Sequence, residues 1–502
     1  MKKTSALAIA PLFLAACGGG GGGSDGGTTP PPAANAPPSF TSAQTASLVE
    51  NGVAAYQATA TDPDGNALTF TIDGGADASL LSITAAGALS FKAAPDYDLP
   101  GDADGDNVYA VQLRVSDGRA SVTQLVNVTV TNSREGISLV RVATFTATDL
   151  AAIPGDSRVY IGSNTGIIYR FDPATGERTP VLEIPDVTDP RFRAGFSLAA
   201  SPDHASSRRL IVFLVSDYTL AGPTLEVRSY TLGEPDTASN YHTLVLMPSP
   251  SGGEFNSGAL GSLSWVGFGP DGYLYMALGD GGWVVGGAYG TLSMYAQNLN
   301  VKFGKVLRAA ISSDGSTISP APGNPFIGGG GDPFIFALGL FSPDHAAFYE
   351  STLIIGEMGR SQTNEIDLMP LDTPRLNFGW PYKEGTFHYS GVAPAGLTPP
   401  AIEVPDGGST RGGYVYRGPV ASLRGQYIFA QIEDEGPSNI LSVPFSRLQQ
   451  GQTLGRSQAA LRNDDFTPDV GAVGRINGFG EDSAGNLFIL AQGGIFMVRQ
   501  GS

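Results

Sequence analysis

The sequence predicts an all-β protein made of a small N-terminal β-sandwich followed by a larger, six-bladed β-propeller. Short apolar runs recur at close spacing, turns rich in glycine, aspartate and proline separate them, and long helical periodicity is missing. The clearest example is the turn Gly269-Pro270-Asp271-Gly272, which precedes an apolar run at 273–278. The same arrangement returns at the apolar runs 167–171 and 487–491. Repetition of this unit favours short strands joined by tight turns.

Composition limits the possible functions. The 502 residues allow two to four domains, and a hydrophobic content of 41% is enough for several cores. The formal net charge of −18 and the lack of a basic patch argue against nucleic acid as a partner. An acidic surface of this kind suits an exported protein or one that binds divalent cations.

The N-terminus predicts export. Residues 1–17 combine Lys2 and Lys3, a short apolar run and small residues before Cys17, which is the pattern of a secretory signal peptide. The segment Leu14-Ala15-Ala16-Cys17 resembles the bacterial lipobox, which implies lipidation of Cys17 and anchoring to the outer membrane, on its periplasmic or surface face. The alternative is a lone reactive thiol, since Cys17 is the only cysteine. Residues 18–38, rich in glycine and then proline, are expected to form a tether.

Residues 39–132 show the alternation of a β-sandwich. Polar and apolar residues alternate at 54–60, 68–72, 108–114 and 122–130, with no helical segment between them. Several acidic motifs lie between these runs, including Pro95-Asp96-Tyr97-Asp98 and the segment 102–107. An EF-hand does not fit this segment, because Leu113 stands at its twelfth position instead of glutamate.

These motifs resemble those of a bacterial cadherin-like repeat, in which acidic residues hold Ca²⁺ near the end of the sandwich. The resemblance implies calcium ligands among Glu50, Asp62, Asp64, Asp96, Asp98, Asp104 and Asp117. The alternative is that these aspartates only form turns. With one repeat in the chain, calcium-mediated stacking would need another surface to complete it.

Residues 136–502 carry a second set of motifs. They are the segments 268–275 with Gly279-Asp280-Gly281-Gly282, 304–308, 323–326, 364–366, 377–381 with 384–385, 412–418 and 478–482. In this order they resemble the glucose/sorbosone dehydrogenase family, whose members are six-bladed propellers that oxidise sugars with pyrroloquinoline quinone (PQQ) and calcium. The resemblance implies a pocket that includes Arg417, Asp280, Asn364 and Glu365, and a 356–359 loop that offers carbonyl groups to calcium.

This sequence differs from the family at positions that the resemblance assigns to the active site. The family's base is a histidine shortly before Phe-Gly-Pro-Asp-Gly, whereas residues 255–264 contain no histidine. An arginine and an asparagine that contact cofactor and substrate in relatives are replaced by Phe341 and Ser342. Of the four histidines, His204 is expected to be structural, and His388 could overhang the mouth of the propeller.

Two functions therefore remain open. The first is a PQQ-dependent sugar dehydrogenase of the cell envelope whose base comes from another residue. The second is a non-catalytic propeller that binds a carbohydrate or a cell-surface protein, with the sandwich as spacer or adhesive module. A dinucleotide-binding loop is excluded, because the glycine pattern 267–272 is followed by a strand instead of a helix. No serine-hydrolase or zincin motif is found.

Overall fold

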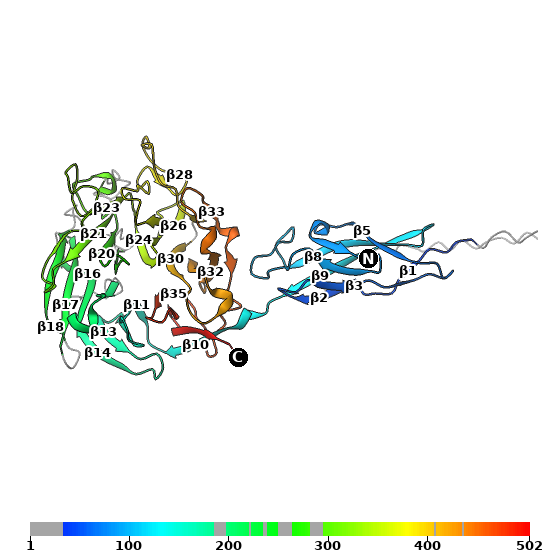
Figure 1. The fold of residues 1–502 in the computed structure, drawn as a ribbon, viewed down its shortest axis with the longest axis horizontal. Coiled ribbons are helices and arrows are strands. Elements are labelled where there is room, and N and C mark those ends of the chain that lie inside the picture. The colour runs from blue at the N-terminus through cyan, green and yellow to red at the C-terminus, as the bar shows by residue number, and fades with distance from the viewer. Residues whose placement is uncertain are drawn as a thin grey trace, which may run out of the picture.

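The computed structural model describes residues 34–184, 197–219, 222–233, 238–248, 264–281, 295–405, 408–433 and 436–501. Two β-rich modules lie end to end, joined near residue 133 (Figure 1). The predicted order of a sandwich followed by a propeller is confirmed. In these described ranges the one α-helix is α1 (His204–Ser207), and none of their helices has the length and hydropathy to cross a bilayer.

The N-terminal module is a sandwich of a four-stranded and a three-stranded sheet. Its strands are β1 (Ser39–Phe40), β2 (Thr45–Val49), β3 (Ala54–Gln57), β4 (Ala60–Thr61), β5 (Thr69–Gly74), β6 (Leu81–Ile83), β7 (Ala88–Phe91), β8 (Val108–Ser116) and β9 (Ser121–Thr131). The sheet orders are β2-β9-β8-β5 and β3-β7-β6, and β1 pairs with β4. Alternate residues of β8 and β9 point inward, so Val111, Leu113 and Val128 are fully buried between the sheets.

The C-terminal module contains six sheets of four or five strands among its described residues. Three of them are built from consecutive strands. The first contains β11 (Ala147–Ala152), β12 (Val159–Ser163), β13 (Ile167–Phe171) and β14 (Arg178–Glu183). The second contains β15 (Ser197–Ala200), β16 (Arg209–Thr219), β17 (Gly222–Leu232) and β18 (Ala238–Pro248). The third contains β19 (Ser264–Phe268), β20 (Leu274–Leu278), β21 (Lys305–Ile311), β22 (Ile318–Pro320) and β23 (Ile335–Leu338).

The fourth and fifth sheets share a stretch of the chain. The fifth contains β30 (Gly408–Val415), β31 (Gln426–Glu433), β32 (Asn439–Pro444) and β34 (Ala460–Leu461). The fourth contains β24 (Pro343–Tyr349), β25 (Thr352–Glu357), β26 (Thr363–Pro370), β29 (Ile402–Pro405) and β33 (Leu454–Gly455), and β33 comes from the segment between β32 and β34.

The sixth sheet joins the two ends of the module. Its order is β10 (Ile137–Ala143), β37 (Gly494–Gln500), β36 (Leu487–Ala491) and β35 (Ile476–Glu481), so the first strand of the module pairs with the last. Strands β11, β15, β19, β24, β30 and β35 contact one another in succession, and β35 returns to β11. These contacts arrange the sheets as the blades of a ring (Figure 1).

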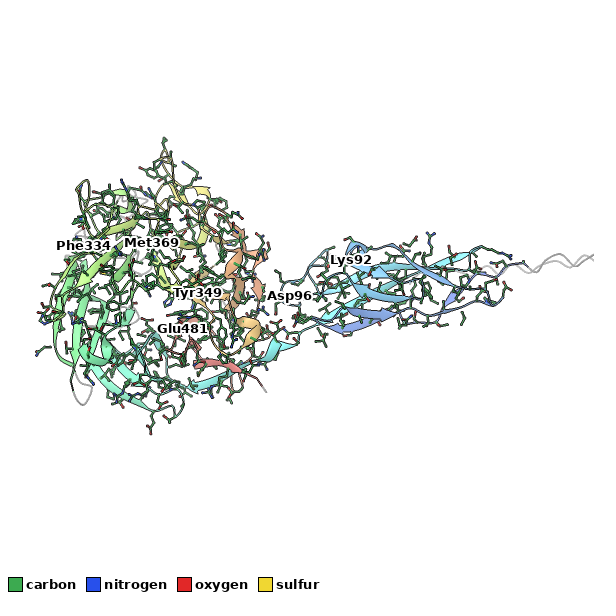
Figure 2. All side chains as sticks on the ribbon, viewed as in Figure 1. Lys92, Asp96, Phe334, Tyr349, Met369 and Glu481 are labelled. Carbon is green, nitrogen blue, oxygen red and sulfur yellow. The ribbon has the colours of Figure 1, made fainter. Side chains whose placement is uncertain are left out.

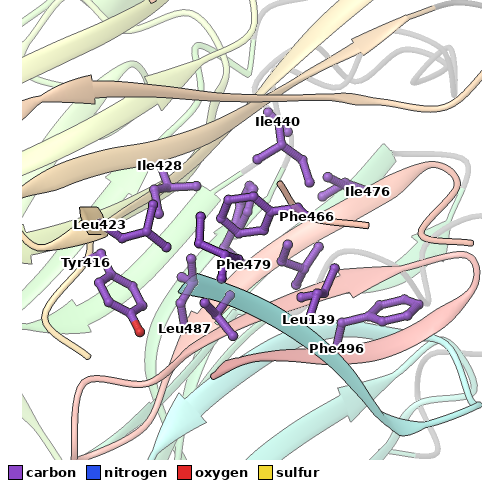
Figure 3. Close-up of a cluster of buried hydrophobic side chains, with 14 of the residues drawn as sticks. Leu139, Tyr416, Leu423, Ile428, Ile440, Phe466, Ile476, Phe479, Leu487 and Phe496 are labelled. Atoms are coloured by element: carbon purple, nitrogen blue, oxygen red, sulfur yellow. The ribbon is translucent and has the colours of Figure 1, made fainter. Parts of the chain in front are cut away.

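Apolar layers between neighbouring sheets hold the ring together. Figure 3 shows one of them, where Phe479 and Leu487 of the closing sheet meet Ile428 of the preceding sheet. The strand predicted after the 269–272 turn is β20, whose five residues are all buried. Gly272 adopts a φ of 80°, as the turn requires. The predicted strands at 167–171 and 487–491 coincide with β13 and β36.

Candidate functional site

Asp280 organises the candidate site at one end of the propeller. It directly follows the buried strand β20 and Gly279, and its backbone N–H donates to the carbonyl of Phe341 at 2.8 Å. Its carboxylate accepts hydrogen bonds from the Ala296 backbone N–H at 3.0 Å and from Trp380 Nε1 at 2.8 Å. Gly281 has a φ of 64° and lies so close to Phe303 that a Cβ atom would fall 2.3 Å from its ring. The predicted pocket residue Asp280 is thus held by three separate segments.

An aromatic cluster lies beside Asp280. The rings of Phe341 and Trp380 have centroids 4.3 Å apart, and Trp380 contacts Tyr389 at 4.9 Å. Phe341 and Trp380 are buried, and Tyr389 packs against them from a partly buried position. Phe341 stands where the resemblance places an arginine, so an apolar ring fills that space and packs against the indole.

Four buried carboxylates lie next to the aromatic cluster. They are Glu357 at the end of β25, Glu365 and Asp367 in β26, and Glu384 in β27 (Lys383–Glu384), and each is at most 5% exposed. Glu357 Oε1 accepts the Phe341 backbone N–H at 2.8 Å, which links this acidic group to the aromatic cluster. Burial and the neighbouring carboxylates raise the pKa of Glu357 and Glu365 well above the ordinary range of a glutamate. Burial raises the pKa of Asp367 to about 8.

Several oxygens of this group have no hydrogen-bond donor among the described residues. They are both carboxylate oxygens of Asp367 and Oε2 of Glu357. Buried polar atoms without a partner are uncommon in native proteins and call for a ligand, a water molecule or a proton. Hard divalent cations such as Ca²⁺ bind carboxylate oxygens together with carbonyl groups and water, so these residue types suit such a cation. Among the described residues, however, no three of the four side chains bring ligand oxygens within 4.8 Å of one another.

The other predicted pocket residues take different positions. Asn364 accepts the Gly359 backbone N–H at 3.1 Å and donates to the carbonyl of Gly408 at 3.4 Å, so it fixes the loop that the resemblance assigns to calcium. Glu365 accepts the backbone N–H of Gly385. Arg417 donates through Nε to Glu481 at 2.9 Å, and this carboxylate neutralises its charge. Among the described residues, no contact joins Arg417 to Asp280 or Glu365.

None of the four histidines occupies the position of the family's base. His204 is buried, its Nε2 bonded to the Tyr160 hydroxyl at 3.0 Å and its Nδ1 to the Arg209 carbonyl at 2.9 Å, in agreement with a structural role. His345 is buried, and burial together with Arg411 lowers its pKa to about 4. His388 contacts the Gly391 carbonyl from an exposed position, and His242 is exposed in β18. Of residues 255–264, where the family's base is expected, residues 255–263 lie outside the described part of the chain.

The seven calcium ligands predicted for the sandwich fall into three separate groups. Glu50, Asp96 and Asp98 each offer an oxygen within 4.8 Å of the others. Asp104 does the same with Asp102 and Asp106, two residues that the prediction did not include. Asp62, Asp64 and Asp117 lie near the start of the module, where Asn35 donates to Asp117 at 2.7 Å and the Ala36 backbone N–H donates to Asp64 at 2.7 Å. Asn35 and Ala36 belong to the segment predicted as tether, yet they contact the sandwich.

The group of Glu50, Asp96 and Asp98 borders the propeller, and Asp96 lies at the end of the sandwich that faces the ring (Figure 2). The propeller places Arg462 here, whose Nη1 donates to Asp98, to Glu135 at 3.0 Å and to Asp465 at 3.0 Å. Burial raises the pKa of Asp98 to about 8, although Arg462 opposes this rise. An arginine thus supplies positive charge at this end of the sandwich.

A family model described as Glucose / Sorbosone dehydrogenase matches residues 146–439. The chain belongs to this family. A second model, described as Bacterial Ig domain, matches residues 34–129 and covers the sandwich. Both agree with the resemblance drawn from the motifs, the second at the level of a β-sandwich.

The chain is similar to plant proteins and to solved bacterial enzymes. HIPL2 protein from Arabidopsis thaliana is 27% identical over 329 residues, which is 57% of this chain and 44% of the plant protein, so the match spans less than half of that relative. A PQQ-bound aldose sugar dehydrogenase from Streptomyces coelicolor aligns with a TM-score of 0.52 at 21% identity, over 72% of this chain and 98% of that enzyme. The soluble aldose sugar dehydrogenase of Escherichia coli in its apo form gives 0.53 at 19% identity, over 72% and 99%. These structures share the fold of the propeller.

The described residues at this site do not fit PQQ. The quinone carries three carboxylates, whereas this end of the propeller gathers Asp280, Glu357 and Glu365, and Phe341 replaces a cationic contact. Lys305 is a nearby cation, but it is completely buried and donates to the carbonyls of Tyr295 at 2.6 Å and Phe303 at 2.8 Å. Burial lowers its pKa to about 7. Lys305 therefore binds backbone carbonyl groups, and its buried ammonium group does not reach a cofactor or a sugar.

Sequence reasoning missed Asp367 and Trp380 as parts of the site. A signal was available for Asp367, because a charged residue between Ile366 and Leu368 in an apolar strand indicates a buried acid. Trp380 was visible only as a family motif, and its bond to Asp280 joins residues one hundred positions apart.

Proposed function

We propose that this chain is an exported, lipid-anchored cell-envelope protein whose propeller binds a sugar beside a divalent cation, without oxidising it. The observation that carries this proposal is the chain of contacts from Glu357 through Phe341 and Asp280 to Trp380. It connects a buried carboxylate group, which suits a cation, to aromatic rings and polar groups, which suit a sugar. Membership of a sugar dehydrogenase family supports a sugar as the ligand class.

In this proposal Glu357 and Asp367 hold the cation, with Glu365 and Glu384 at its side. Without a cation the raised pKa values keep part of this group protonated, and cation binding releases these protons. Since Glu357 also positions Phe341, a bound cation would fix the aromatic cluster and so prepare the surface for the sugar. Calcium is the expected ion, both here and in the sandwich.

The second candidate function is oxidation of an aldose with PQQ. Membership of the family favours it, because relatives of this fold are aldose sugar dehydrogenases and one of them binds PQQ. The cofactor would supply the redox chemistry, and the base would come from a residue other than histidine at the family position. Losing a general base lowers the rate by about 10² to 10⁴.

One experiment separates the two functions. The purified chain is mixed with PQQ and Ca²⁺, cofactor binding is followed by absorbance, and dye reduction is followed with a panel of aldoses. The same sugars are titrated in a calorimeter. Heat of sugar binding without dye reduction supports the binding function, whereas turnover with PQQ supports the dehydrogenase. Absence of both results would remove the sugar as ligand and leave a protein partner at the cell surface to be sought by cross-linking.

The envelope location has its own test. Lipidation of Cys17 would hold the protein in the membrane fraction, because acyl chains bury methylene groups in the bilayer. A Cys17→Ala variant is expected to leave this fraction, while a Ser24→Ala variant in the tether stays. Equal membrane retention of both variants would contradict the anchor.

A further inference from the structure

A cavity lined by two arginines lies beside β10, the first strand of the sheet that closes the ring. None of its lining residues belongs to the Asp280 site. Its volume is about 470 Å³, and it is lined by Arg141, Val142, Ala143, Thr144, Phe145, Gly176 and Arg178. One wall is the end of β10 and the segment after it, and the other is the turn between β13 and β14. The turn approaches closely, since a Cβ atom at Gly176 would lie 3.3 Å from the carbonyl of Val142.

Both arginines of this cavity lack a carboxylate partner among the described residues. Arg141 uses its backbone N–H to bind Asp469, but no hydrogen bond or ion pair of its guanidinium is found there. Arg178 lies over the rings of Phe145, at 4.2 Å, and Tyr169, at 4.9 Å, and also lacks an anionic partner. In a chain with 47 acidic and 29 basic residues, two unpaired guanidinium groups on one cavity stand out.

We infer that this cavity binds a small ligand that carries an oxyanion, namely a carboxylate, sulfate or phosphate group. Guanidinium groups bind such groups with two parallel hydrogen bonds, and aromatic contacts hold the Arg178 side chain in place for this purpose. The Thr144 hydroxyl and the Phe145 ring supply further polar and apolar surface. The volume lies within the usual range for small-molecule sites, so the ligand is an acidic monosaccharide or a molecule of similar size.

Two acids near this cavity already accept backbone hydrogen bonds. Asp172 accepts the backbone N–H of Ala174 at 2.8 Å within the turn, and Asp469 accepts the backbone N–H of Arg141 at 3.0 Å. Both carboxylates are thus turned to backbone groups. Arg499 adds positive charge at the back of the turn, where it donates to the carbonyl of Pro173 at 3.5 Å.

Calorimetric titration of the full chain tests this inference. The probes are glucuronate, glucose 6-phosphate and sodium sulfate, with glucose as the neutral control and sodium chloride at matched ionic strength. We expect saturable binding of at least one oxyanion, weakened by about tenfold or more in Arg141→Gln and in Arg178→Gln. Arg119→Gln in the sandwich is the matched control and should bind as the wild type does.

Three results would overturn the inference. They are equal affinity in the wild type and both cavity variants, equal binding of glucose and glucuronate, and heats that follow ionic strength alone. If the glutamine variants lose the circular dichroism spectrum of a folded protein, the titration is repeated with Arg141→Lys and Arg178→Lys, which keep the positive charge. These lysine variants should retain weakened binding, and full affinity in them would contradict bidentate recognition by arginine.

Discussion

One hydrogen bond, from Trp380, connects Asp280 to the aromatic cluster of the candidate site. The indole donates to the buried carboxylate of Asp280 and its ring packs against Phe341. We expect Trp380→Phe to lower the free energy of unfolding by about 1 to 3 kcal/mol, because it leaves one oxygen of Asp280 unpaired in the interior. Urea unfolding checks this. Trp265→Phe, in a layer where no such bond is found among the described residues, is the control, and an equal loss in both would contradict the role of the bond.

The buried carboxylates should make stability depend on pH. Burial raises the pKa of Asp367 to about 8 in the folded state, so the folded protein binds more protons than the unfolded chain between about pH 4 and pH 8. Stability therefore falls as pH rises through this window, by at most about 1.4 kcal/mol per pH unit for one such group. Thermal unfolding from pH 5 to pH 8.5 measures this slope.

Asp367→Asn is expected to flatten that slope, and Ca²⁺ added at pH 8 should restore stability in the wild type more than in the variant. Asp73→Asn, in an exposed ion pair of the sandwich, is the matched control. If Asp367→Asn leaves the slope of stability against pH unchanged, other groups cause the pH dependence and the prediction for Asp367 is wrong.

The pairing of β10 with β37 closes the ring. Phe496 of β37 is completely buried in the layer shown in Figure 3. Phe496→Ala should cost about 3 to 5 kcal/mol, whereas Arg499→Ala on the same strand should cost far less because its side chain is partly exposed. Chemical denaturation of both variants tests this, and similar midpoints would argue that the closing strand contributes little to the stability of the ring.

Much of this architecture could be predicted from local patterns. The strands β13, β20 and β36 follow from apolar runs between turn residues, because turn chemistry and alternation act over a few residues. The candidate site could be predicted only in part. Asp280 and Glu365 lie in motifs, but the burial of Asp367 depends on strands that meet only in the folded ring. The sequence shows that Phe341 stands in place of an arginine. It does not show that the Phe341 ring packs against Trp380.

Arg462 connects the propeller to the sandwich. Its guanidinium contacts Asp98 of the sandwich, Glu135 at the junction of the two modules and Asp465 of its own module. No local pattern could have indicated a contact across 364 positions. Removing one partner from a buried ionic group costs about 3 to 5 kcal/mol.

We therefore expect Arg462→Met to loosen the junction between the modules. Small-angle scattering should detect a broader distribution of overall dimensions, and limited proteolysis should cut faster near residue 133. Arg119→Met, on an exposed turn of the sandwich, should change neither measurement. Unchanged scattering and cleavage in the Arg462 variant would show that apolar contacts alone fix the two modules.

In the proposed function, a cation held by the buried carboxylates prepares the candidate site for a sugar. Calorimetric titration of an aldose panel into the full chain, once with Ca²⁺ and once with a chelator, tests it most directly. We expect heat of binding with Ca²⁺ that is lost with the chelator and in Asp367→Asn. Sugar binding of equal strength under all three conditions would contradict it.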